Sequence, residues 1–89
     1  MATSFPVLQR ADRPIAATVD VWASLHAALD PDIPLKKLRA FARSEAPAVR
    51  RAAAFNVAAP TDLLRELSHD ADTCVREAAE YSLKARGVR

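Results

Sequence analysis

The sequence predicts an all-α fold in the form of a short α-solenoid, a stack of helical repeats with a period of about 26 residues. Two observations lead to this prediction, namely the amino-acid composition and an internal repeat. The chain has 20 alanines and one glycine among its 89 residues, a bias that favours helix. Its valines and phenylalanines are too scattered to form the alternating apolar and polar pattern that is typical of strands.

The internal repeat appears when residues 38–56 are laid over residues 64–82, a shift of 26 positions. Six of the nineteen aligned positions are identical, and Pro60 repeats Pro34 at the same shift. A second shift of 26 residues toward the N-terminus aligns further similar residues, and we call each such set of three a ladder. The chain therefore holds about 2.5 to 3 units. The ladders are Ile15/Phe41/Leu67, Ala23/Val49/Val75, Ala27/Ala53/Ala79 and Leu29/Phe55/Tyr81. We expect Phe41 with Leu67, and Phe55 with Tyr81, to be core pairs.

The bounds of the predicted elements follow from the prolines and the glycine of the chain. Residues 1–17 are predicted to form an N-terminal arm or cap, because Pro6 and Pro14 interrupt any helix there. Residues 18–89 form the predicted helical repeat domain. Each unit pairs a shorter helix with a longer one, and the shorter helices begin at prolines, where a missing N–H costs nothing. The predicted helices cover 21–29, 34–43, 47–56, 60–68 and 73–86, with Gly87 closing the last.

The last predicted helix shows the expected buried stripe at spacings i, i+3, i+4, i+7 and i+8. Its small side chains allow a close approach of neighbouring helices, and leucines of the shorter helices fill the remaining space. We expect one continuous core. Its members are Val49, Ala53, Leu64, Leu67, Val75, Ala79 and Leu83.

Residues 56–67, with Asp70, Asp72 and the run Val75-Arg76-Glu77-Ala78-Ala79, resemble the variant leucine-rich repeat family. The resemblance is clearest over residues 34–80. It implies HEAT-like units, each pairing an α-helix with a shorter helix, stacked into a right-handed superhelix. Ala59 stands where the family often has a capping threonine. The chain also lacks the N-terminal cysteine cluster of members with an iron–sulfur module, so we expect no cofactor.

The sequence offers no pattern typical of a catalytic or metal site, so we expect a protein that is not an enzyme. The densest group of possible ligands is Ser68–Cys74, and its aspartates fall where the repeat needs a turn and a helix N-cap. His26 lies four residues before Asp30, but no nucleophile has a defined place beside it, and we expect a core or boundary histidine.

The cellular setting is also constrained. A single cysteine, Cys74, excludes an internal disulfide and is ordinary in a reducing compartment. No apolar stretch approaches the roughly 18 residues of a membrane span. We therefore expect a cytoplasmic protein with no membrane partner.

The remaining candidates for function lie on the surface. The net charge is only +2, but basic residues recur at repeat spacing, as in Arg39/Arg65 and Arg50/Arg76. The predicted partner-binding basic face consists of Lys36, Arg39, Arg43, Arg50, Arg51, Arg65 and Arg76. We predict that this face binds an acidic protein partner and that the chain is a small adaptor or regulator. The alternatives are nucleic-acid binding and a merely solvated or ion-paired face.

A second surface lies at the N-terminal end of the predicted array. Trp22, Leu25 and Leu29 form an apolar patch there, next to Phe5 of the arm. Either the arm folds over Trp22 and caps the solenoid, or the patch meets a second chain and forms a homodimer. The sequence predicts self-association through Phe5, Trp22, Leu25 and Leu29.

Overall fold

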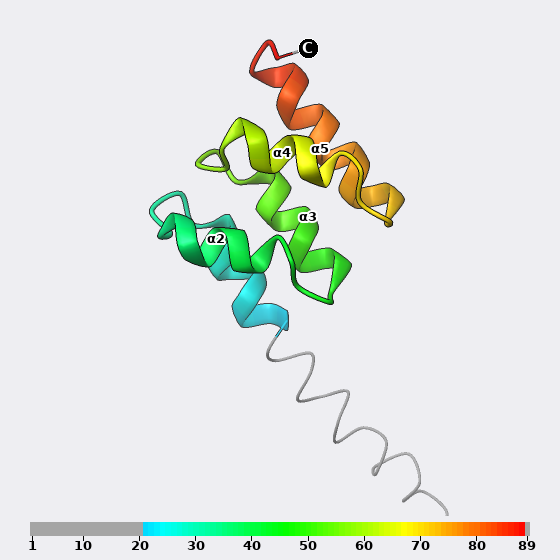
Figure 1. Ribbon diagram of the computed structural model, residues 1–89. Helices are drawn as coiled ribbons and strands as arrows, with labels where there is room; N and C mark the ends of the chain where they lie inside the picture. Colours follow the sequence, from blue (N-terminus) through cyan, green and yellow to red (C-terminus); the bar gives the residue numbers. More distant parts are fainter. Residues whose placement is uncertain (1–20, 89) are drawn as a thin grey trace, which may run out of the picture.

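The computed structural model describes residues 21–88, and within that range every regular element is a helix. Residues 21–29 are helical, and they are followed by four helices that Figure 1 labels α2 to α5. The bounds of these are α2 Leu35–Phe41, α3 Pro47–Phe55, α4 Thr61–Leu67 and α5 Thr73–Ala85. The all-α prediction is confirmed for the described residues, and from residue 29 onward each predicted helix end lies within two residues of the observed one. The predicted arm, 1–17, lies outside the described residues.

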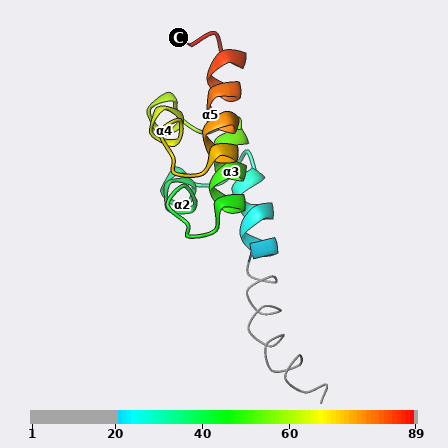
Figure 2. The same cartoon turned by 90° about the vertical axis from the view of Figure 1, so that its right-hand side faces the viewer.

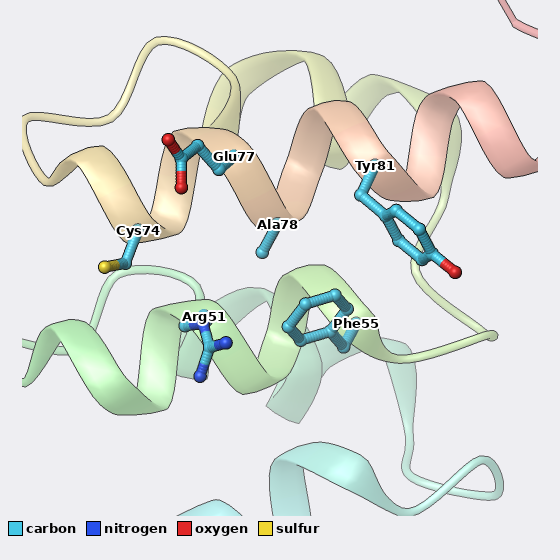
Figure 3. Close-up of a pocket in the computed structure, with 6 residues that line it drawn as sticks. All are labelled: Arg51, Phe55, Cys74, Glu77, Ala78 and Tyr81. Carbon is cyan, nitrogen blue, oxygen red and sulfur yellow. The ribbon is translucent and has the colours of Figure 1, made fainter.

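The helices form two layers. Figure 2 shows α2 and α4 on one side, and the segment 21–29 with α3 and α5 on the other. Within the second layer α3 and α5 lie side by side, as Figures 1 and 3 both show. The Ser82 hydroxyl of α5 donates a hydrogen bond of 2.7 Å to the Ala54 carbonyl of α3. Short and long helices thus alternate along the chain and separate into opposite layers.

Local chemistry explains both ends of α5. The Asp72 side chain caps the first turn by accepting from the backbone N–H groups of Cys74 (2.8 Å) and Val75 (3.2 Å). At the other end Gly87 adopts φ +75°, and the N–H of Val88 reaches back to the Leu83 carbonyl at 2.9 Å. This is a Schellman closure, which requires the left-handed conformation that glycine adopts without strain.

The Asp72 cap gives a first testable prediction. Asp72→Ala is expected to lower the free energy of unfolding by about 1 kcal/mol, since two N–H groups of the first turn lose their acceptor. Urea denaturation followed by circular dichroism measures the change. Glu66→Ala removes an exposed carboxylate from α4 and is the matched control, with an expected change below about 0.5 kcal/mol. Equal losses in the two variants would show that the cap contributes nothing specific.

The core comprises two clusters joined by Phe41, which packs against both. The larger cluster contains five of the seven predicted core residues, with Leu83 partly buried at its edge. Val49 belongs to the smaller cluster, with Ala28 and Ala52. The buried stripe of α5 is confirmed, since Val75, Ala78, Ala79 and Ser82 are all buried.

Two burial predictions are wrong. Phe55 and Tyr81 are 38% and 66% exposed, so their ladder lies on the surface. Tyr81 stands six positions after Val75, outside the buried spacings of α5, and the helix turns it away from the core. His26 is also exposed. Its equivalents Ala52 and Ala78 are buried. Ala52 lies on α3 and Ala78 on α5, and each of these long helices has another long helix before it in the described residues. The helical segment that contains His26 has none before it in that range.

Hydrogen bonds between the units recur with the repeat. The Asn56 side chain donates to the Ala28 carbonyl (2.7 Å), just as Ser82 does to Ala54, and both bonds span 28 residues. Arg50 donates to the Ser44 carbonyl (2.7 Å) and Arg76 to the Asp70 carbonyl (2.8 Å), each six residues back. Equivalent residues of successive units therefore make equivalent bonds.

Candidate interaction surfaces

The seven residues of the predicted basic face do not form one surface, because three of them bind other parts of the chain. Arg39 lies on α2 and its Nη2 is 3.2 Å from a carboxylate oxygen of Asp62 on α4. This pair is well exposed, so it adds little to stability. It does, however, neutralise part of the charge that α2 presents to solvent.

Arg50 and Asp70 form the strongest ion pair among the described residues. Nε and Nη2 of Arg50 donate to the two carboxylate oxygens at 2.8 and 3.0 Å, and its third nitrogen donates to the Ser44 carbonyl. The pair is largely buried, with side-chain exposures of 16% and 10%. The hydrogen bond from Arg50 lowers the pKa of Asp70, outweighing the opposite effect of burial, and the bond from the Asp72 N–H lowers it further.

Arg76 is likewise used internally. Its Nη1 donates to the carbonyls of Asp70 (2.8 Å) and Ala71 (3.2 Å), and its Nη2 donates to the Thr73 hydroxyl at 2.9 Å. The guanidinium therefore fastens the turn between α4 and α5. Arg50 and Arg76 are parts of the scaffold, and the ion pair of Arg50 corresponds to the ion-paired alternative considered for this face.

Arg39 and the four other cations of the predicted face divide between the two layers. Lys36, Arg39 and Arg43 stand on one side of α2 and the turn that follows it, and α2 contains no acidic residue. Arg65 is exposed on α4 at the position equivalent to Arg39. We call these four residues the basic face. Arg51 lies in the other layer, on α3, with its guanidinium 5.2 Å from the centre of the Phe55 ring.

The layer of α3 and α5 carries a groove that the sequence analysis did not predict. Figure 3 shows its central part, where side chains of both helices border one hollow of about 360 Å³. The Phe55 and Tyr81 rings stand edge to face, with centroids 6.1 Å apart. Hollows of about 390 Å³ and 270 Å³ continue the groove toward Val57 and toward Pro47. We call this feature the α3/α5 groove.

The signal that could have found the groove is the Leu29/Phe55/Tyr81 ladder itself. A repeated apolar position indicates a repeated environment, which is either the core or an exposed edge shared by successive helices. The burial stripe of α5 distinguishes the two, because Tyr81 falls outside it. Two exposed aromatic rings in a small domain are typical of an interaction surface.

The predicted self-association residues are only partly on a common patch. Trp22 and Leu29 are 59% and 52% exposed, and Trp22 lies against His26 with ring centroids 5.8 Å apart. Leu25 is partly buried against the cluster of Val49. Phe5 lies outside the described residues.

The segment Ser68–Cys74 forms the predicted turn. Asp70 accepts from Arg50 and from the Asp72 N–H, while Asp72 caps α5, so both carboxylates are engaged in structure. Within 21–88, no group of three or more His, Cys, Asp or Glu side chains is placed to hold a metal ion. Over the same range no helix is long and apolar enough to cross a bilayer.

Comparison with known proteins adds no relative to this description. No protein-family model matches the chain, and neither a curated protein nor a solved structure matches it. The resemblance to variant leucine-rich repeats therefore depends on the sequence pattern alone.

Proposed function

We propose that this chain is a non-catalytic protein-interaction module, a small adaptor or regulator that binds an acidic partner through its basic face. The observation that carries the proposal is the charge distribution of α2 and the turn after it, where Lys36, Arg39 and Arg43 recur at helical spacing and residues 35–43 include no acidic residue. A one-sided cluster of cations attracts and orients an acidic surface more effectively than the modest net charge of the chain.

The scaffold that we propose for this surface is a short right-handed α-solenoid. The alternation of short and long helices supports it, as do the two kinds of hydrogen bond that recur in successive units. In such an array each unit contacts only its neighbours, and equivalent residues stand in rows on the surface. Arg39 and Arg65 form such a row. A cytoplasmic location, which suits the single free thiol, is part of the same proposal.

Nucleic-acid binding is the second candidate and rests on the same cations. It is less favoured because the cations available to a phosphate backbone are fewer than the sequence indicates. Arg50 and Arg76 are held by Asp70 and by turn carbonyls, and Arg39 is paired with Asp62.

The test is a binding titration with two probes, a short fluorescent peptide rich in Glu and Asp and a fluorescent DNA duplex. We expect the peptide to bind at about 50 mM salt, and Lys36→Glu to weaken this binding by about 10-fold. Lys84→Glu makes the same charge change on α5, in the other layer, and is expected to change the affinity by less than about 3-fold.

The outcomes separate the two candidates. Tighter binding of the duplex than of the peptide, with loss of duplex binding in Lys36→Glu, would replace the protein partner by nucleic acid. Equal effects of Lys36→Glu and Lys84→Glu would mean that only net charge matters, and this would remove α2 as the binding site.

A further inference from the structure

The α3/α5 groove carries a charge pattern that is complementary to itself. Arg51 of α3 and Glu77 of α5 are 26 positions apart in the sequence, and both line the same hollow (Figure 3). Both are exposed, and neither forms an ion pair with any residue of 21–88. One cation and one anion thus stand at equivalent points of adjacent helices and face solvent.

The shape of the groove follows the same pattern. Phe55 and Tyr81 lie four residues after Arg51 and Glu77, about 6 Å further along the two helices on the same side. In the opposite direction the hollow of about 270 Å³ is bordered by Pro47, Ala48, Arg51, Asp72 and Cys74. The aromatic rings, like the two charges, therefore stand at equivalent points of the adjacent helices.

We propose that the α3/α5 groove is a self-association surface whose occupant is the same groove of a second copy. A two-fold axis that runs between α3 and α5, parallel to both helices, makes such a contact isologous, so that each residue pair occurs twice. Arg51 of each copy then faces Glu77 of the other, and α3 of one copy lies parallel to α5 of the other. The same rotation places Phe55 of each copy over Tyr81 of the other, so the exposed aromatic rings of the two copies cover one another.

Charge selects this arrangement over the nearest alternative. A two-fold axis through the middle of α3 would place Arg51 against its own copy, and that like-charge contact is unfavourable. Trp22 belongs to the segment 21–29, which packs beside α3 away from α5 and so lies outside the pairing centre. The dimer inferred here thus differs from one centred on Trp22. It uses the layer opposite the basic face, and it is independent of the proposed function (Figure 2).

The test is a charge-swap cycle monitored by sedimentation between about 1 and 200 µM protein, a range that includes weak dimers. We expect the wild type to form a dimer, and Arg51→Glu and Glu77→Arg each to weaken it by at least about 10-fold, since like charges then meet twice. The double variant Arg51→Glu/Glu77→Arg restores both attractions and is expected to return the affinity to within about 3-fold of wild type.

Two controls and a second readout complete the experiment. Lys36→Glu on the basic face and Trp22→Ala are each expected to leave the dimer affinity within about 3-fold of wild type. The thiol of Cys74, the only cysteine of the chain, borders the groove, so its reaction with a disulfide reagent should slow as the dimer forms. Circular dichroism checks that every variant is folded.

Three results would overturn the proposal. The first is a wild type that stays monomeric up to about 200 µM. The second is a dimer that neither single charge reversal weakens or that the double variant fails to restore. The third is a dimer that Trp22→Ala abolishes while Arg51→Glu leaves it intact.

Discussion

Replacing Asn56 by alanine is expected to lower the free energy of unfolding by about 3 kcal/mol, the largest effect that we predict for a single polar side chain. Asn56 is only 1% exposed. Its amide nitrogen donates to the carbonyls of Ala28 (2.7 Å) and Asp30 (2.9 Å), and its amide oxygen accepts from the N–H of Ala58 at 2.7 Å. Removing the side chain leaves the buried Ala28 carbonyl without its donor and the Ala58 N–H without its acceptor, while the Asp30 carbonyl keeps only the Ile33 N–H at 3.1 Å. The loss of a buried partner costs about 1 to 3 kcal/mol.

The position of Asn56 explains why these bonds matter together. Ala28 and Asp30 lie at the end of the helical segment 21–29, where carbonyls have no partner within the helix. Asn56 follows α3 directly and ties that open end to the next unit. Its loss is expected to loosen the segment 21–29 as well as to lower global stability.

The measurement is urea denaturation at pH 7, with Ser82→Ala as the matched control. Ser82 is the equivalent residue of the next unit, and its hydroxyl makes one bond, to Ala54. Its replacement is expected to cost about 1 kcal/mol. If Asn56→Ala costs no more than Ser82→Ala, the bonds from Asn56 to Ala28 and Asp30 contribute nothing beyond a single hydrogen bond.

The fold class and helix positions could be predicted because they depend on local and periodic features. Alanine-rich segments favour helix, prolines and glycine mark helix ends, and a repeat at fixed spacing assigns equivalent residues to equivalent places. Val49 and Val75 illustrate this, since both are fully buried. The spacing of the repeat therefore predicts which of these positions are buried.

Contacts between units were harder to predict because repetition identifies equivalent positions and not their environment. Phe55 and Tyr81 repeat on the surface, whereas Ala53 and Ala79 repeat in the core. Arg50 and Arg76 repeat because each binds a turn carbonyl six residues earlier, and a sequence pattern alone does not separate such an arginine from one that faces solvent. Side-chain reach and turn geometry decide between them, and both depend on the folded backbone.

The two candidate surfaces also differ in how far they could be predicted from local sequence. Spacing of 100° per residue placed Lys36, Arg39 and Arg43 on one side of the helix predicted over residues 34–43, and that prediction required only one local segment. The α3/α5 groove needs two helices that are distant in sequence to lie side by side, and no local pattern specifies how their side chains border a hollow.

Replacing Arg50 by alanine is the second change with a large expected effect, a loss of about 2 to 3 kcal/mol at pH 7. It leaves the largely buried Asp70 carboxylate without its bidentate partner and the Ser44 carbonyl without a donor. Arg50→Lys keeps the charge but loses the two-nitrogen geometry, and an intermediate loss is expected. Arg65→Ala removes the exposed arginine of α4 and is the control, with an expected change below about 0.5 kcal/mol.

The pH dependence separates loss of the ion pair from loss of packing. Because Arg50 lowers the pKa of Asp70 in the folded state, the pair stabilises the protein above the ordinary carboxyl pKa of about 3.9. That stabilisation is lost as the pH falls through the lower folded value, where Asp70 takes up a proton. The difference in unfolding free energy between the wild type and Arg50→Ala should therefore shrink between about pH 5 and pH 2. A difference that stays constant over this range would show that Arg50 acts through packing and its bond to Ser44, and not through its charge on Asp70.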